Sequence, residues 1–141
     1  MLYQHLDTGK HDRLVGQLAK ASKLPIELAV AGQPAQAGRV SVLPPGLGIE
    51  ARGDGVAFVT GSSLPAIVAA LQPAESAVLV LSGGDPVVVP AVQKLKAAGG
   101  HVFAQDPSSC FDAVAPQALV AQGAATAPVA GLARQITECW S

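Results

Sequence analysis

The sequence predicts an α/β protein, a doubly wound three-layer α/β/α domain with a mainly parallel sheet and an inserted antiparallel hairpin. Ala77–Leu81 is a continuous apolar run, typical of a strand covered on both faces. Helical and strand patterns alternate through the second half, which favours right-handed parallel crossovers. Gly53-Asp54-Gly55 separates two short runs and indicates a hairpin. At 141 residues, 50% of them hydrophobic, residues 1–141 are expected to form a single domain.

The first half is expected to supply a helix, short strands and the hairpin. Leu14, Val15 and Leu18 recur at helical spacing, and Arg39–Leu43 alternates in a way that favours a half-exposed strand. The expected elements are a strand tail at Leu2–Leu6, a helix over Asp12–Ser22, strands over Leu24–Ala31 and Arg39–Leu43, and the hairpin strands Gly48–Arg52 and Val56–Thr60.

The second half is expected to supply the parallel strands and their crossover helices. Ser62 or Ser63 can cap a helix that runs to about Leu71, and Gly99-Gly100 can end another with a left-handed residue. Ser108 or Ser109 can cap a short turn. The other expected elements are the strand Ala77–Leu81, a helix over Pro86–Ala98, a strand over His101–Gln105, and helices over Ala115–Ala121 and Val129–Cys139.

Composition argues against several classes of partner. The formal net charge is −1, so there is no basic excess for nucleic acid. No apolar run approaches the roughly 18 residues of a membrane span, and the first residues lack the features of a signal peptide, which favours a cytoplasmic protein without membrane insertion. Cys110 and Cys139 are expected to be reduced thiols. His11 and His101 have no partner at ligand spacing, so we expect neither a metal nor a cofactor.

Three positions could carry chemistry, and each also has an ordinary structural explanation. His5 could be a general base at a strand end, or a surface histidine. Asp85 could orient such a histidine from the carboxyl end of a neighbouring strand, where ligands of α/β sheets collect, or it could cap a helix. Ser62 could be a nucleophile exposed by the Gly61-Ser62-Ser63 turn, or a helix cap.

Several motifs, in order, resemble the catalytic domain of CheB-type protein-glutamate methylesterases, over nearly the whole chain. Tyr3-Gln4-His5 is similar to the family's V-Q-H, and Arg39–Gly46 to its strand ending in A-P-P-G. Leu81-Ser82-Gly83 is similar to L-T-G. The most specific match is Ala98–Cys110, which is similar to the family's A-G-G-x-x-x-A-Q-D-x-x-S-C. Pro116–Gly123 is similar to the P-x-x-A-x-x-x-G that follows.

The resemblance implies a serine-hydrolase triad acting on glutamate methyl esters of chemoreceptors. By position His5 would be the base, and Gly83 and Gly84 would belong to the loop whose backbone holds the oxyanion. When the family's motif L-T-G-M-G-x-D-G is aligned from Leu81 without a gap, Val87 stands at the position of the family's aspartate. Asp85 would serve as the acid if the loop is two residues shorter.

The nucleophile is where the chain departs most from the family. The family's serine lies in G-A-S-T-G-G, one β-α unit before the Q-H strand. The 141 residues start at that strand, so we expect the first β-α unit to be missing, with Ser62 as a weak substitute. The family's H-R-P-S-V-D segment has no counterpart in Val59–Pro65.

These features predict a CheB-like chemosensory domain that is inactive as an esterase by itself. One alternative is a non-catalytic module that binds a methyl-accepting chemoreceptor or another signalling protein. A third, distant alternative is a small phosphate- or nucleotide-binding domain, based on Ser62 and Ser82–Gly84 near helix starts. Loss of a first strand would expose a sheet edge, which predicts pairing of two copies.

Overall fold

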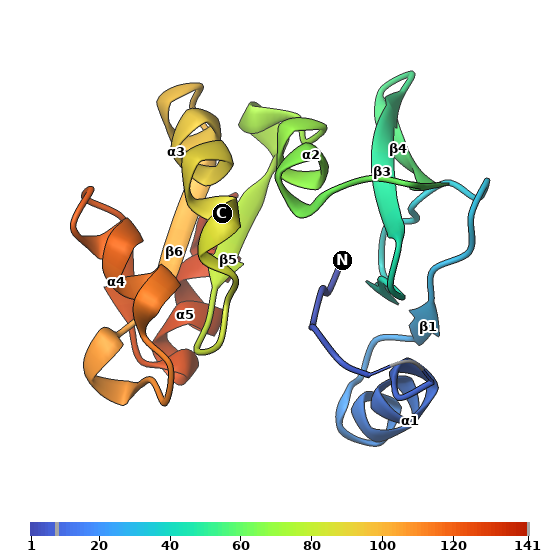
Figure 1. The fold of residues 1–141 in the computed structure, drawn as a ribbon, viewed down its shortest axis with the longest axis horizontal. Coiled ribbons are helices and arrows are strands. Elements are labelled where there is room, and N and C mark those ends of the chain that lie inside the picture. Colours follow the sequence, from blue (N-terminus) through green and yellow to red (C-terminus); the bar gives the residue numbers. More distant parts are fainter. Residues whose placement is uncertain (8, 141) are drawn as a thin grey trace. The chain divides into compact units, whose positions relative to one another are not determined.

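The chain forms two compact units, Met1–Ala70 and Leu71–Ser141 (Figure 1). The structure is a computed structural model that describes residues 1–7 and 9–140. Its ladders form three sheets: a parallel pair and an antiparallel pair in the first unit, and a three-stranded parallel sheet in the second. This mixture of helices and parallel strands confirms the α/β class. That residues 1–141 form a single domain stays a prediction.

The first unit is organised around strand β2 (Val40–Val42), which is paired along both of its edges. Strand β1 (Ile26–Leu28) pairs parallel to it on one edge, and Leu2 forms a parallel bridge to Val42 on the other. The expected half-exposed strand is wrong: Ser41 and Val42 point to opposite faces of β2, and both are buried. Helix α1 (His11–Ala21) packs against β1.

The hairpin lies within this unit, at the predicted place. Strands β3 (Leu47–Arg52) and β4 (Gly55–Thr60) pair antiparallel, with Arg52 opposite Gly55. The tight turn needs a positive φ at its first central residue, and Gly53 supplies it at 62°. Phe58 on β4 is one of the largest fully buried side chains, and helix α2 (Leu64–Ala69) packs against β3.

The second unit is built on strand β6 (His101–Gln105), the middle strand of the order β5-β6-β7. Residues Val102 to Gln105 are all buried, and neighbouring side chains on a strand point to opposite faces, so both faces of β6 are covered. Helices α3 (Val89–Ala97), α4 (Val114–Val120) and α5 (Val129–Glu138) all pack against it.

Two sequence predictions for this unit need correction. Ala77–Leu81 was expected to be covered on both faces, but strand β5 (Ala77–Val80) lies at an edge of its sheet and is mostly half-buried. Strand β7 (Ala125–Ala127) was not predicted, because three small residues give no apolar alternation. The helix ends agree well with the predictions, and Gly99 has the left-handed φ of 99° expected after α3. Short 3₁₀ turns occupy Pro73–Glu75 (η1), Pro86–Val88 (η2) and Pro107–Ser109 (η3).

Candidate functional site

His5 lies three residues beyond the Leu2 bridge, in a segment without regular structure, so the predicted strand tail is much shorter than expected. Its side chain is exposed. A cavity of about 50 Å³ adjoins it, and the residues lining this cavity are Tyr3, Gln4, His5, Leu6, His11 and Pro45. His5 is therefore accessible to a small polar group on one side.

His11 holds the segment that carries His5. Its imidazole is 5% exposed, and Nε2 lies 3.1 Å from the Gln4 carbonyl oxygen. A carbonyl only accepts, so Nε2 carries the proton in this bond. Nδ1 is buried and has no partner among the described residues. We expected no role for His11, yet the sequence held a signal: with Leu14, Val15 and Leu18 it completes the apolar stripe of α1.

The loop after β5 is tied to the loop after β6 by hydrogen bonds of Ser82 and of the buried Gln105 side chain. The Ser82 amide donates to Gln105 Oε1 at 2.9 Å, and the Gln105 amide nitrogen donates to the Ser109 carbonyl and hydroxyl, both at 3.2 Å. The Ser82 hydroxyl accepts from the amides of Phe111 and Asp112, at 3.0 and 3.1 Å. Gln105 is 8% exposed, so these bonds satisfy a side chain that would otherwise be costly to bury.

Gly83 and Gly84 use their backbone amides inside this loop. The Gly83 amide donates to the Asp112 carbonyl at 3.0 Å, and the Gly84 amide donates to the Leu81 carbonyl at 3.0 Å. A Cβ on Gly84 would lie 2.8 Å from Val80 Cγ1, so only glycine fits here. Both amides predicted to hold an oxyanion thus have backbone partners in this structure.

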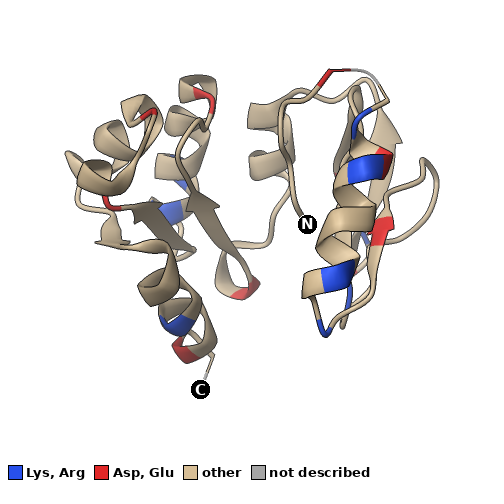
Figure 2. Ribbon diagram, turned by 90° about the horizontal axis from the view of Figure 1, so that it is seen from below, with Lys and Arg blue, Asp and Glu red and all other residues tan. Residues whose placement is uncertain are grey.

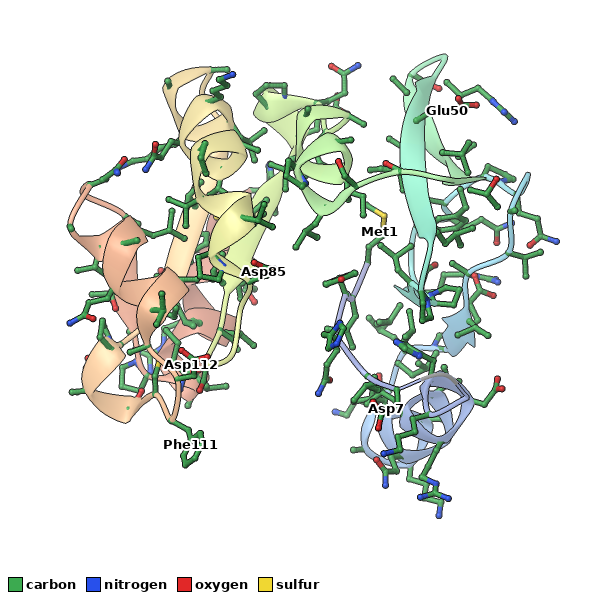
Figure 3. All side chains as sticks on the ribbon, in the orientation of Figure 1. Met1, Asp7, Glu50, Asp85, Phe111 and Asp112 are labelled. Carbon is green, nitrogen blue, oxygen red and sulfur yellow. The ribbon has the colours of Figure 1, made fainter. Side chains whose placement is uncertain are left out.

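Asp85 caps the 3₁₀ turn η2. Its Oδ1 accepts from the Val87 amide at 3.0 Å, and its carboxylate is exposed at the carboxyl end of β5 (Figure 3). This is the capping function that the sequence left open. His5 belongs to the first unit and Asp85 to the second, so the predicted pairing of their side chains stays a prediction.

Ser62 and Ser63 have separate contacts at the start of α2. Ser63 Oγ accepts from the Ala66 amide at 3.3 Å, so Ser63 is the helix cap. The Ser62 hydroxyl donates weakly to the Ser63 carbonyl at 3.4 Å, and its Cβ fills the space over Gly48, where a Cβ would clash. No base contacts Ser62 among the described residues.

The two loops of the second unit carry a negative field. Burial, then the carboxylates of Asp106 and Asp112, raise the pKa of the Cys110 thiol above its usual value. Asp106, rather than Ser108 or Ser109, caps η3 by accepting from the Ser108 amide at 3.0 Å. Residues 1–7 and 9–140 hold no group of three or more side chains able to bind a metal ion. Nor does any helix in these ranges have the length and apolar character to cross a membrane.

Comparison with known proteins agrees with the arrangement of strands and loops. Residues 1–136 match the model of the CheB methylesterase family. The chain belongs to this family. The crystal structure of the Thermotoga maritima CheB methylesterase catalytic domain aligns over 96% of this chain and 80% of that one, with a TM-score of 0.84 and 23% identity. At that identity it shows a shared fold. No curated protein matches the chain in sequence.

The most specific CheB-like motif, Ala98–Cys110, has identifiable structural functions. Gly99 and Gly100 end α3, where the Gly100 amide donates to the Leu95 carbonyl at 2.9 Å. Gln105 holds the Ser82 loop, and Ser109 accepts from Gln105. Much of the motif's polar content therefore fixes the loops at the carboxyl ends of β5 and β6.

Proposed function

We propose that this chain is a CheB-type chemosensory signalling domain that does not hydrolyse glutamate methyl esters by itself. The family match over residues 1–136 supports the chemosensory class. The observation that carries the lack of activity is that Ser62, the only serine considered as a substitute nucleophile, packs over Gly48 and has no base hydrogen-bonded to it among the described residues. Asp85 is compatible with either outcome, because its Oδ1 accepts from the Val87 amide at 3.0 Å while Oδ2 is able to accept from an imidazole.

The nucleophile position and His5 support the same proposal. The 141 residues contain no G-A-S-T-G-G turn, and Ser62 packs over Gly48 with no base in contact. Loss of a triad serine removes most of the rate of such an enzyme. His5 is exposed and would be the base only in a protein that supplies a nucleophile.

A methanol-release assay tests the proposal. The purified chain is incubated with methylated chemoreceptor, and methanol is measured against a sample without protein. We expect no release above that background. Release that is abolished by His5→Ala or by Ser62→Ala would show that a triad operates within these residues and would overturn the proposal.

A binding function is the second candidate, and the exposed Phe111 at the loop edge favours it. A non-catalytic CheB-like module would bind a methyl-accepting chemoreceptor or another chemosensory protein in the cytoplasm. Saturable pull-down of a receptor's cytoplasmic region, unchanged by His5→Ala, is the expected result. Binding that is lost with His5→Ala would favour an active-site complex instead.

Pairing of two copies through a sheet edge remains part of the proposal. Strand β5 pairs with β6 on one side and lies at the edge of its sheet on the other. An open edge of a parallel sheet presents unpaired N–H and C=O groups. Elution as a dimer at high concentration is expected, and a strictly monomeric profile would contradict it.

A further inference from the structure

Four apolar side chains are exposed around the carboxyl ends of β5 and β6. Phe111 is 105% exposed and projects away from the loop that carries it (Figure 3). Leu81, Val87 and Val114 are exposed as well. Large apolar side chains that cluster on a surface mark interaction sites more often than single ones do.

Hydrogen bonds and packing hold the segments that carry these side chains together. The Ser82 hydroxyl, next to Leu81, accepts from the Phe111 amide. Val114 begins α4 two residues after Asp112, and α4 packs against η2, which contains Val87. The loops are thus held together, and the four side chains share a preformed support.

The same surface carries only negative charge. Residues 81–88 and 105–114 contain three acids and neither Lys nor Arg, and the acids are Asp85, Asp106 and Asp112. None of the three forms an ion pair with any residue that the structure describes. Figure 2 colours the acidic residues red and the basic residues blue on the ribbon. We call these three acids, with Leu81, Val87, Phe111 and Val114, the acidic apolar rim.

The two lysines of α3 lie at the far end of that helix from the rim. Lys94 and Lys96 lie in the last turn of α3, away from the start of that helix at the rim. Lys96 Nζ donates to the Gly123 carbonyl at 2.7 Å, in the loop before β7. The rim therefore keeps its uncompensated charge.

We propose that the acidic apolar rim docks a partner-protein segment that carries apolar side chains flanked by Lys or Arg. The apolar groups would cover Phe111 and its neighbours, and the cations would meet Asp85, Asp106 and Asp112. A segment rich in Glu or Asp would be repelled by the same charges. This inference rests on the proposed binding function and names the chemistry of the partner.

The test uses the full chain and two labelled helical peptides of equal length, one built from Leu and Lys and the other from Leu and Glu. Fluorescence anisotropy is expected to show saturable binding of the Leu/Lys peptide, at least tenfold tighter than the Leu/Glu peptide. Phe111→Ser and Val114→Ser should each weaken it at least fivefold. Asp112→Asn should weaken it and reduce its dependence on salt.

Trp140→Ser is the control. Trp140 is 55% exposed, against 59% for Val114, and it lies against His101 at the amino end of β6. Equal affinity for the two peptides, or equal losses with Trp140→Ser and Val114→Ser, would overturn the inference. So would self-association of the chain that Phe111→Ser abolishes, because a second copy would then be the occupant. Since these variants lie on the surface, their circular dichroism is expected to match that of the wild type. Asp112→Asn tests the charge of the rim independently of its apolar side chains.

Receptor pull-down distinguishes the two levels of the proposal. If the receptor binds equally well to wild type and Phe111→Ser, the binding function stands and the rim is wrong as its site. If neither the receptor nor another chemosensory protein binds, but the Leu/Lys peptide does so selectively, the rim stands and its assignment to chemosensory partners is wrong.

Discussion

The two segments that carry the predicted histidine and acid are held in different ways. The segment before His5 has ladder bonds at Leu2 and one side-chain anchor, the imidazole of His11 on the Gln4 carbonyl. The loop before Asp85 is held by the Ser82 amide, the Ser82 hydroxyl and the Gly83 amide. One segment has a single buried polar contact, and the other belongs to a network.

The difference shows that the loop of the second unit is fixed by its fold whether or not chemistry takes place there. Gln105 and Ser82 hold the backbone, and Oδ1 of Asp85 caps η2. A rigid loop that presents apolar side chains suits binding, because little conformational entropy is lost when a partner docks. The His5 segment is expected to be the more easily perturbed of the two.

The largest expected effect tests whether the two units are energetically separate. Phe58→Ala empties a fully buried site in the first unit and should lower the free energy of unfolding by about 3–5 kcal/mol. Trp140 lies against His101 in the second unit, with ring centroids 5.6 Å apart, so its fluorescence reports on that unit. A single domain predicts that circular dichroism and Trp140 fluorescence shift together.

A shift confined to circular dichroism would contradict the single-domain prediction. Leu119→Ala, in the buried face of α4, is the matched variant of the second unit. The double variant Phe58→Ala/Leu119→Ala, measured with the two single variants, gives the coupling energy between the units.

Gln105→Leu tests the network of the second unit. It removes the acceptor of the Ser82 amide and the donor to Ser109, and should cost about 1–3 kcal/mol of unfolding free energy. Hydrogen exchange at the Ser82 amide should accelerate more than exchange along β6. Gln117→Leu, on the exposed side of α4, is the control and should change neither quantity.

Ser63→Ala tests the assignment of the cap at α2. Loss of the bond to the Ala66 amide should cost about 1 kcal/mol, measured by urea unfolding. Ser62→Ala keeps this cap and should cost less. The reverse order would mean that Ser62 has a function that its contacts do not show.

His11→Phe should have a smaller effect on the first unit than Gln105→Leu has on the second. It leaves the Gln4 carbonyl without its donor, worth about 1 kcal/mol, but also removes the buried and unpaired Nδ1. Hydrogen exchange over residues 3–6 should rise while the melting temperature changes little. A loss of stability equal to that of Gln105→Leu would mean that His11 stabilises the first unit as strongly as the Gln105 network stabilises the second.

Patterns of apolar residues predicted most helices and strands, but they did not predict which polar side chains would be buried. The Gly53-Asp54-Gly55 turn and the ends of α1, α3 and α5 follow from local rules. Strand β7 and the burial of Ser41 do not, because both depend on which strands become neighbours. The hydrogen bonds of His11 and Gln105 could not be predicted either, because their partners, Gln4 and Ser82, are 7 and 23 residues away along the chain.

The smallest expected effect concerns the reactivity of Cys110. Burial and the carboxylates of Asp106 and Asp112 raise its pKa, so little thiolate forms at pH 7.5. The folded state holds this proton more tightly than the unfolded chain does, so stability falls as the pH rises from the ordinary thiol pKa through the raised one. In a Cys139→Ser background, Asp112→Asn should lower the pKa and speed alkylation by iodoacetamide severalfold. Asp85→Asn is the matched control, because Asp85 is not among the charges that raise the pKa of this thiol. Equal acceleration by both variants would mean that the field of the loop edge is diffuse, and a basic partner would then be attracted to the whole edge without a preferred register.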